Sequence, residues 1–429
     1  MDPLGGRLST EASIGEKAPR EIATSALQGI RVLDLSRVFA GPSCAQILAD
    51  LGADVIKVER PRVGDDTRSW GAPFLPDQSG APTSESAAFC SSNRNKRSVT
   101  VDISVPAGQE IAKGLAAISD VVIENFKVGT LDRYGLGYSA LSAVNPRLIY
   151  CSITGFGQTG PYRARPAYDT IVQAMGGLMS ITGHSDGEPG AGPLKAGVAV
   201  TDVMTGLYGA VAVLAGLQFR SIAGKGQHID LSLLDVQVAG LFNVGMNFLA
   251  TGKIPARMGN RLPTLYPSDA FRCADGYMML IVGNDQQFER FCKASGMVGV
   301  AADPRFTTNE LRIKNANALA PMISATLEKR PAKEWIALFE GHGVACGPIN
   351  NLEQVFEDPQ VQAREMLVTT EHPLAGTMRS IGNPIRFSAS PVRYGSAPPT
   401  LGQHTESVLK DLLGMSGERL AELSASGVI

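Results

Sequence analysis

Two short apolar runs flank a helical segment near the start of the chain, and this arrangement limits the folds that are open to it. Ile30–Leu35 and Asp54–Val58 have the length and composition of buried strands. Between them, Pro42 suits the first position of a helix because its φ is fixed, and Gly52 suits a helix end. A strand, a helix and a second strand in this order form a parallel, right-handed unit. We therefore expect an α/β fold.

The same alternation continues along the next part of the chain. Helices are expected at Pro106–Ile118 and Thr170–Met179. Strands are expected at Ser98–Ile103, Val121–Glu124, Leu148–Ile153 and His228–Leu234. The pattern predicts an open, doubly wound, Rossmann-like sheet, which binds ligands beyond the carboxyl ends of its strands. The first strand–helix turn lacks GxGxxG, which disfavours an NAD enzyme.

The pattern changes at about Thr251. A hairpin over Ala270–Val282 and helices near 286–294, 311–328 and 332–339 predict a smaller α+β domain over 251–345. Before it we assign a flexible tail to 1–28, the first part of a large domain to 29–220, and a linker with a connecting strand and helix to 221–250.

Composition excludes several classes of partner. The 39 Lys and Arg residues against 41 Asp and Glu residues give a net charge of -2, which argues against nucleic acid or a membrane surface as a partner. The six cysteines lack CxxC spacing, so we expect reduced thiols and no metal site. The longest apolar helix, Met204–Phe219, is too short for a bilayer span. The tail lacks a signal sequence and contains acids, so we expect a cytoplasmic protein, with mitochondria as the alternative.

One acid lies at the start of that apolar helix, in the stretch GVAVTDVMTGLYGAVAVLAGLQF. Either Thr201 or Asp202 can cap the helix, because their side chains accept hydrogen bonds from free N–H groups of the first turn. On spacing alone the cap is the simpler interpretation, and a chemical role for Asp202 is the alternative.

Several motifs resemble those of the class III coenzyme A transferases, the formyl-CoA transferase and CaiB/BaiF family. They are GVAVTDVMTG around Asp202, GIRVLDLSRVFAGP and LGQHT. GDDTRSWG, NRNKRSV, YCSITGFGQTGP and GPINN are similar to members that act on succinate and hydroxymethylglutarate. The resemblance covers 29–429 and identifies the chain as a member of this family.

The resemblance carries expectations about architecture and chemistry. It implies that Asp202 is the nucleophile, that 346–429 returns to a discontinuous large domain, and that two subunits interlock as a homodimer. It also implies acyl-CoA and small carboxylic acids as partners, with no cofactor beyond CoA itself.

The resemblance also implies contacts to CoA. The matching positions are Phe39, Arg60, Val101, Asp102, Asn125, Phe126, Arg133, Tyr168 and Asp169. Two positions depart from formyl-CoA transferase. Pro166 replaces a Lys, so one phosphate contact is lost or replaced, and Phe39 replaces a Gln that can donate a hydrogen bond near the acyl group. The substrate should therefore differ from formate.

Arginines near Gly259 suggest a dicarboxylic substrate. A guanidinium binds a carboxylate through two parallel hydrogen bonds, so Arg257 or Arg261 can hold the unreacted carboxylate of such an acid. A solvated basic loop is the plainer interpretation. Trp70 is a further candidate for substrate contact.

These residues and motifs admit three functions. The favoured one is transfer of CoA, from succinyl-CoA to a dicarboxylic acid, through an aspartyl anhydride and an aspartyl-CoA thioester on Asp202. The second is a racemase of 2-methylacyl-CoA from the same superfamily. That reaction needs a second acid/base, a His before an Asp, and Tyr168 occupies this position. The third, a CoA-binding protein without activity, is disfavoured because the context of Asp202 is intact.

Overall fold

A computed structural model describes residues 25–429. Most of the expected tail, residues 1–24, lies outside the described residues. Its last four residues belong to the fold, which corrects the boundary at 28. Ser25 and Leu27 are buried, and the Leu27 N–H donates to the Leu51 carbonyl at 2.9 Å.

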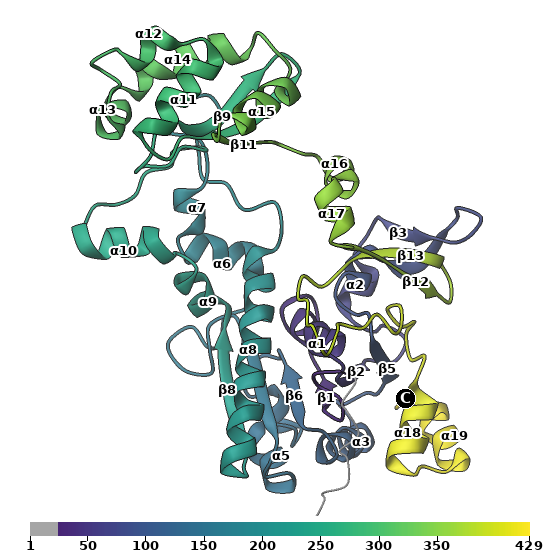
Figure 1. Ribbon diagram of the computed structural model, residues 1–429. Coiled ribbons are helices and arrows are strands. Elements are labelled where there is room, and N and C mark those ends of the chain that lie inside the picture. The colour runs from purple at the N-terminus through teal and green to yellow at the C-terminus, as the bar shows by residue number, and fades with distance from the viewer. Residues whose placement is uncertain (1–24) are drawn as a thin grey trace, which may run out of the picture.

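Six parallel strands form the central sheet of the molecule (Figure 1). They are β1 (Arg31–Asp34), β2 (Asp54–Glu59), β5 (Lys96–Thr100), β6 (Val121–Glu124), β7 (Ile149–Thr154) and β8 (Gln227–Ser232). Their order across the sheet is β5-β2-β1-β6-β7-β8. This is the Rossmann order, and its direction reverses between β1 and β6, where ligands of such sheets bind.

Helices cover both faces of this sheet, as a doubly wound fold requires. On one face lie α1 (Ala40–Asp50), α6 (Asp169–Met175) and α8 (Val200–Ala223), with Cys44, Val172 and Val213 in the buried core. On the other lie α3 (Pro106–Ala117), α4 (Thr130–Arg133), α5 (Tyr138–Val144), α18 (Thr405–Leu413) and α19 (Gly417–Ala425). Val408 and Leu420 belong to this second core, so the end of the chain packs on this face of the sheet.

The predicted strands are all present, with ends that differ by a few residues. The first helix begins at Ala40 rather than Pro42, because the chain turns just before it, at Val38, with a φ of 70°. The helix expected over 170–179 is two helices, α6 and α7 (Leu178–Ile181). They are separated at Gly177, whose φ of 88° is incompatible with a continuous helix.

The expectation for the long apolar helix was wrong. It runs for 24 residues rather than from Met204 to Phe219, and it is long and apolar enough to cross a membrane by length and composition. Half of its most apolar window is buried inside the protein, where it packs against α1, β7 and β8. The core helix of a soluble protein can have the same length and apolar composition.

The small domain contains an antiparallel sheet in the order β11-β10-β9, with β9 (Ser268–Cys273) and β10 (Gly276–Ile281) as the predicted hairpin. Its core is formed with α11 (Asp285–Ser295), α12 (Val298–Ala301), α14 (Ala316–Leu327) and α15 (Ala332–Gly341), and α13 (Asn309–Lys314) adds the buried Arg312. The helix expected at 311–328 is thus two helices. The third strand, β11 (Ala345–Pro348), pairs with β10, so this sheet extends beyond the expected boundary at 345.

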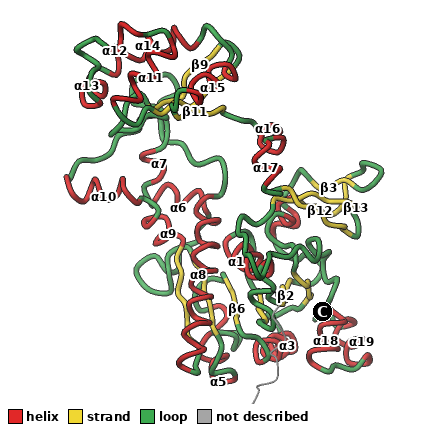
Figure 2. Tube along the Cα trace, viewed as in Figure 1, coloured by secondary structure: helices red, strands yellow, loops and turns green. Residues whose placement is uncertain are grey.

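The expected linker over 221–250 is largely structured. It holds the end of α8, the sheet strand β8, α9 (Leu233–Ala239) and most of α10 (Phe242–Thr251). Two mainly irregular connections join the small domain to the rest, one after α10 and one between β11 and α16 (Figure 2). The remaining elements are η1 (Asp66–Ser69), β3 (Phe74–Pro76), β4 (Pro82–Ser86), α2 (Ala87–Cys90), α16 (Leu352–Glu357), α17 (Pro359–Ala363), β12 (Leu367–His372) and β13 (Gly376–Ile381).

Candidate functional site

The ends of β1 and β6 are joined where the strand order reverses. The Arg37 N–H donates to Asn125 Oδ1 at 2.9 Å, and Asn125 Nδ2 donates to the Arg37 carbonyl at 2.6 Å. The next residue, Val38, has a left-handed backbone that is unfavourable for a β-branched side chain. Its N–H donates to Asp65 Oδ1 at 3.2 Å. These contacts fix the turn that carries Phe39 to the start of α1.

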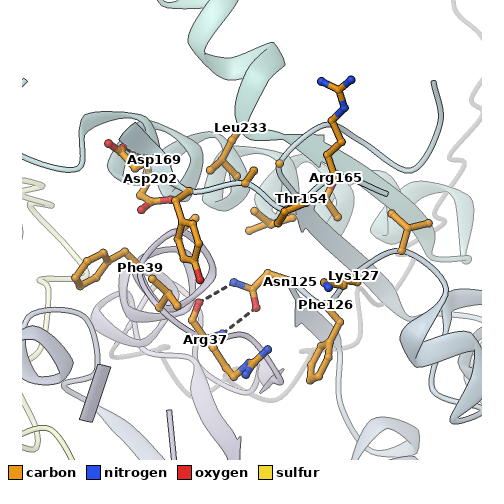
Figure 3. A pocket seen from close by; sticks show the side chains of 18 of the residues that line it. Arg37, Phe39, Asn125, Phe126, Lys127, Thr154, Arg165, Asp169, Asp202 and Leu233 are labelled. Atoms are coloured by element: carbon orange, nitrogen blue, oxygen red, sulfur yellow. Dashed lines mark hydrogen bonds between the residues drawn. The ribbon is translucent and has the colours of Figure 1, made fainter. Parts of the chain in front are cut away.

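A cavity of about 230 Å³ opens at this turn (Figure 3). Its walls come from the turn after β1, the segments after β6 and β7, and the first turns of α6 and α8. Asp202 and Asp169 lie on one side of it, and Lys127 and Arg165 on the other. Its charged and aromatic lining residues are Arg37, Phe39, Asp66, Phe126, Lys127, Arg163, Arg165, Tyr168, Asp169 and Asp202.

Asp202 is the third residue of α8, after an N-cap at Ala199 that makes no side-chain hydrogen bond. The plainer of the two interpretations drawn from spacing, a cap by the side chain of Thr201 or Asp202, is wrong. The cap comes from α6, because Asp169 Oδ2 accepts hydrogen bonds from the Thr201 N–H at 2.8 Å and the Asp202 N–H at 3.1 Å. The Asp202 carboxylate accepts no hydrogen bond from any residue of 25–429.

The environment of Asp202 favours its protonated form. The residue is 7% exposed. Burial, and secondarily the negative charge of Asp169, raise the pKa of Asp202 to about 7. Near neutral pH a large fraction of this carboxylate is ionised but weakly stabilised, which makes it a suitable nucleophile.

A second cavity of about 260 Å³ lies beyond the ends of β1, β2 and β5. Arg60, Val101 and Asp102 line it, and Arg37 and Phe126 line both cavities. An elongated ligand can therefore place one end beside Asp202 and the other beside Arg60. CoA has this shape, with a phosphorylated nucleotide at one end and a thiol at the other.

A fully buried cluster of ion pairs supports the second cavity. Lys57 Nζ lies 2.9 Å from Asp65 Oδ2, and both side chains are inaccessible to solvent. Burial by itself would raise the pKa of Asp65. Lys57 and the hydrogen bonds from Thr67 outweigh this effect and lower the pKa below its usual range, to about 2. Lys57 Nζ also donates to the Ser36 carbonyl at 2.8 Å, so the cluster holds the turn before Phe39.

Most predicted CoA contacts line these two cavities. Phe39, Asn125, Phe126, Tyr168 and Asp169 lie with Asp202, while Arg60, Val101 and Asp102 lie in the second cavity. The side chain of Asp169 is occupied by the α8 backbone, so only its backbone stays a predicted CoA contact.

Four predicted residues lie elsewhere. Arg133 is exposed and outside both cavities. The Trp70 ring packs edge-on against Phe39, with centroids 5.6 Å apart. Arg257 pairs with Asp186, and Arg261 with Asp269, so in a single chain neither arginine lines the cavity of Asp202.

Sequence reasoning missed four cations of the first cavity. They are Arg37, Lys127, Arg163 and Arg165. Signals were present: Arg37 lies two positions before Phe39, Lys127 follows Asn125-Phe126, and the two others lie three positions and one position before Pro166. In residues 25–429 no group of three His, Cys, Asp or Glu side chains is arranged to hold a metal ion.

Comparisons with known proteins identify the family of the chain. CoA-transferase family III matches residues 27–405. The chain is 47% identical to succinate–glutarate CoA-transferase of Agrobacterium fabrum over 90% of this chain and 95% of that protein. It is 42% identical to succinyl-CoA:glutarate CoA-transferase of Homo sapiens over 94% of this chain and 90% of that one.

A solved structure agrees with the fold. The crystal structure of a CaiB/BaiF family protein from Brucella suis superposes with a TM-score of 0.83 at 43% identity, over 91% of this chain and all of that chain. Its similarity extends over both the large and the small domain. With the two cavities, the buried acid and these relatives taken together, the chain belongs to CoA-transferase family III and is a class III CoA-transferase.

Proposed function

We propose that this enzyme moves CoA from succinyl-CoA to a dicarboxylic acid, with Asp202 as the nucleophile. The observation that carries the proposal is the buried Asp202 carboxylate, which accepts no hydrogen bond from the described residues 25–429. It faces a cavity that shares Arg37 and Phe126 with a second cavity. The names of the relatives, which specify succinate or succinyl-CoA and glutarate, support the choice of acids.

The reaction proceeds by acyl transfer through Asp202. A carboxylate oxygen of Asp202 attacks the thioester carbonyl of the donor, the C–S bond breaks, and CoA leaves as a thiolate, giving a mixed anhydride. The thiolate then attacks the aspartyl carbonyl and the anhydride C–O bond breaks. Succinate is released, and an aspartyl-CoA thioester remains on the enzyme. The acceptor carboxylate reverses both steps. No proton is transferred, and burial of Asp202 protects the anhydride from water.

The cations of the first cavity suit substrates with several negative charges. Arg37, Lys127, Arg163 and Arg165 supply sites for phosphate groups or for the unreacted carboxylate of a dicarboxylic acid. Arg165 lines the cavity directly before Pro166. It can replace the phosphate contact that a Lys at 166 would make.

We also propose an interlocked homodimer. Large apolar side chains of α8 and α10 are exposed in the single chain, and apolar faces of this extent mark interfaces. They include Val203, Leu207, Tyr208, Val211 and Ile222 of α8, and Phe242, Met246 and Leu249 of α10. Sedimentation should find a dimer at nanomolar protein. A monomer under these conditions contradicts this proposal. A cytoplasmic location also stays a proposal.

The test of function is a panel of donors and acceptors. Each acyl-CoA is incubated with each acid, and the products are separated by liquid chromatography. We expect glutarate and similar dicarboxylic acids to accept CoA from succinyl-CoA, and donor alone to leave an adduct on the peptide that contains Asp202. Formate or oxalate as the best acceptor contradicts the assignment. Exchange at the α-carbon of a 2-methylacyl-CoA in deuterated water, without acceptor, would favour the racemase.

A further inference from the structure

Asp169 and Asp202 both lie at the start of α8, and they differ in the hydrogen bonds that they accept from backbone N–H groups. Asp169 receives the N–H groups of Thr201 and Asp202, whereas the Asp202 side chain receives none. Both carboxylates are buried, at 8% and 7% exposure. The acid that belongs to the helix is therefore excluded from the donors of its own first turn.

This arrangement reverses the usual one. An acid in the first turn of a helix is stabilised by the free N–H groups and by the positive end of the helix dipole, and its basicity falls accordingly. Here a residue of another helix takes these donors. The N–H groups of α8 therefore stabilise the carboxylate of Asp169, which does not react with the substrate in the proposed mechanism.

The Asp169 carboxylate is held firmly in this position. Gln173 Nε2 donates to its other oxygen, Oδ1, and Gln173 Oε1 accepts from the Ala196 N–H at 2.9 Å. On α8 itself, Thr201 Oγ1 donates to Gln237 Oε1 at 2.7 Å. Both glutamines are almost completely buried. The start of α8 and the end of the preceding loop are thus locked to Asp169.

We infer that Asp169 is a positioning residue that occupies the N–H donors of α8 and thereby leaves Asp202 unstabilised and strongly nucleophilic. The inference rests on the proposed function, because it assigns Asp169 its effect through Asp202. Asp169 neither attacks the substrate nor carries the acyl group. It sets the reactivity of the residue that does.

Other charged groups around the cavity do not account for the state of Asp202. From the turn after β1 comes Arg37, from η1 Asp66, from the segment after β6 Lys127, and from the segment after β7 Arg163 and Arg165. Four of the five are cations, which would stabilise an ionised carboxylate. Asp169 is the charged neighbour that raises the pKa of Asp202, and it adds to the effect of burial.

The experiment measures the ionisation of Asp202 without substrate. The melting temperatures of the wild-type protein and of Asp202→Asn are compared as a function of pH. Their difference grows as the pH rises above the ordinary pKa of an aspartate and levels off at the pKa of Asp202 in the folded state; we call this pH the midpoint. The pair is then repeated with Asp169→Asn in both proteins. Asparagine removes the charge and keeps an oxygen that can accept the two N–H bonds, but its amide nitrogen then faces the donor Gln173 Nε2. Asp169→Ala, made in the same two proteins, also removes the acceptor and frees both N–H groups for Asp202. Asp235→Asn, an exposed acid on α9, is the control with the same change in net charge.

We expect the midpoint near pH 7 to fall by roughly one pH unit with Asp169→Asn, which is about a tenfold change in the ionisation constant, and to stay in place with Asp235→Asn. In transfer assays kcat above the midpoint should fall severalfold, with little change in KM for the acyl-CoA. With Asp169→Ala the midpoint should fall at least as far, because Asp202 can then accept the freed N–H groups. An unchanged midpoint with Asp169→Ala overturns the inference. If the Asp169 variants do not fold, the wild-type protein alone provides the test. A midpoint at the ordinary pKa of an aspartate then overturns the inference.

The two proposals fail separately. Loss of the proposed transferase function would appear as absent turnover with every donor and acceptor, while the melting experiment would still report the midpoint of Asp202. A shifted midpoint without transfer would support the role of Asp169 and contradict the proposed function.

Discussion

Two groups of buried carboxylates lie at the same edge of the central sheet and differ in how they are compensated. Within and next to the sheet, Asp34 of β1 pairs with Lys96 of β5, and Lys57 of β2 pairs with Asp65 of the following loop, each at 2.9 Å with no solvent exposure. In α8, Asp202 has the carboxylate of Asp169 as its charged neighbour, and its side chain accepts no hydrogen bond within the part of the chain that the structure describes. The pKa is lowered for Asp34 and Asp65 and raised for Asp202.

The difference separates scaffold from chemistry. Burial alone would raise the pKa of all three acids. Where cations lie close, the carboxylates become permanent charges that fix the loops of the cavity walls. Where no cation pairs with the acid, the carboxylate stays reactive and costs the folded state free energy whenever it is ionised. The paired acids Asp34 and Asp65 thus have a structural role, whereas the unpaired Asp202 is available as the nucleophile.

The largest expected effect comes from Asp202→Asn. Because an amide cannot form the anhydride, transfer should fall by several orders of magnitude. The fold should become more stable at about pH 8, on the order of 2–4 kcal/mol, because ionised Asp202 has a raised pKa and its ionisation favours the unfolded state. Turnover assays and thermal unfolding measure the two effects. Near-normal turnover, or loss of stability, contradicts this account.

The next largest effect is expected from Lys57→Met, which removes the cation of the buried Lys57–Asp65 ion pair. It leaves Asp65 buried without its cation, so the free energy of unfolding should fall by about 3–5 kcal/mol. Residual folded protein should transfer CoA with a higher KM, since Lys57 lines the second cavity. Urea denaturation followed by circular dichroism measures the stability. A change as small as that of a surface charge would show that the buried pair is not needed.

The pH dependence of transfer should report Asp202 alone. Since the ionised form is the nucleophile, kcat/KM should fall about tenfold per pH unit below a midpoint near 7. Asp65, with a pKa of about 2, stays ionised in this range, and its contribution to stability is lost only as the pH falls through about 2. Rates and circular dichroism are measured together. Loss of structure in parallel with the rate would contradict this separation.

The smallest effect is expected at an exposed pair. Arg419 and Glu422 lie one turn apart on α19, 2.9 Å from each other, and both are more than half exposed. Solvent screens such a pair, so Arg419→Ala should change the free energy of unfolding by no more than about 0.5 kcal/mol. Transfer should be unaffected. A loss similar to that of Lys57→Met would mean that burial does not determine the energetic difference.

The amino-acid sequence was sufficient to predict the alternating strands, the open doubly wound sheet and the family, because buried runs and short motifs are local properties of the chain. It also identified Asp202 as the candidate nucleophile from the motif around it. It misplaced the start of α1 and the length of α8, because the causes are a left-handed turn at Val38 and a cap from another helix.

Which acid caps α8 was decided by tertiary structure alone. Asp169 lies 33 positions before Asp202 in the chain, and only the packing of α6 against α8 brings its carboxylate to the helix start. The same holds for Lys57, whose charge is paired with Asp65 only because β2 and the following loop fold back on each other. A local pattern determines which residues can form a helix or a strand. The electrostatic state of a carboxylate depends on distance and burial, which are set by contacts between distant segments.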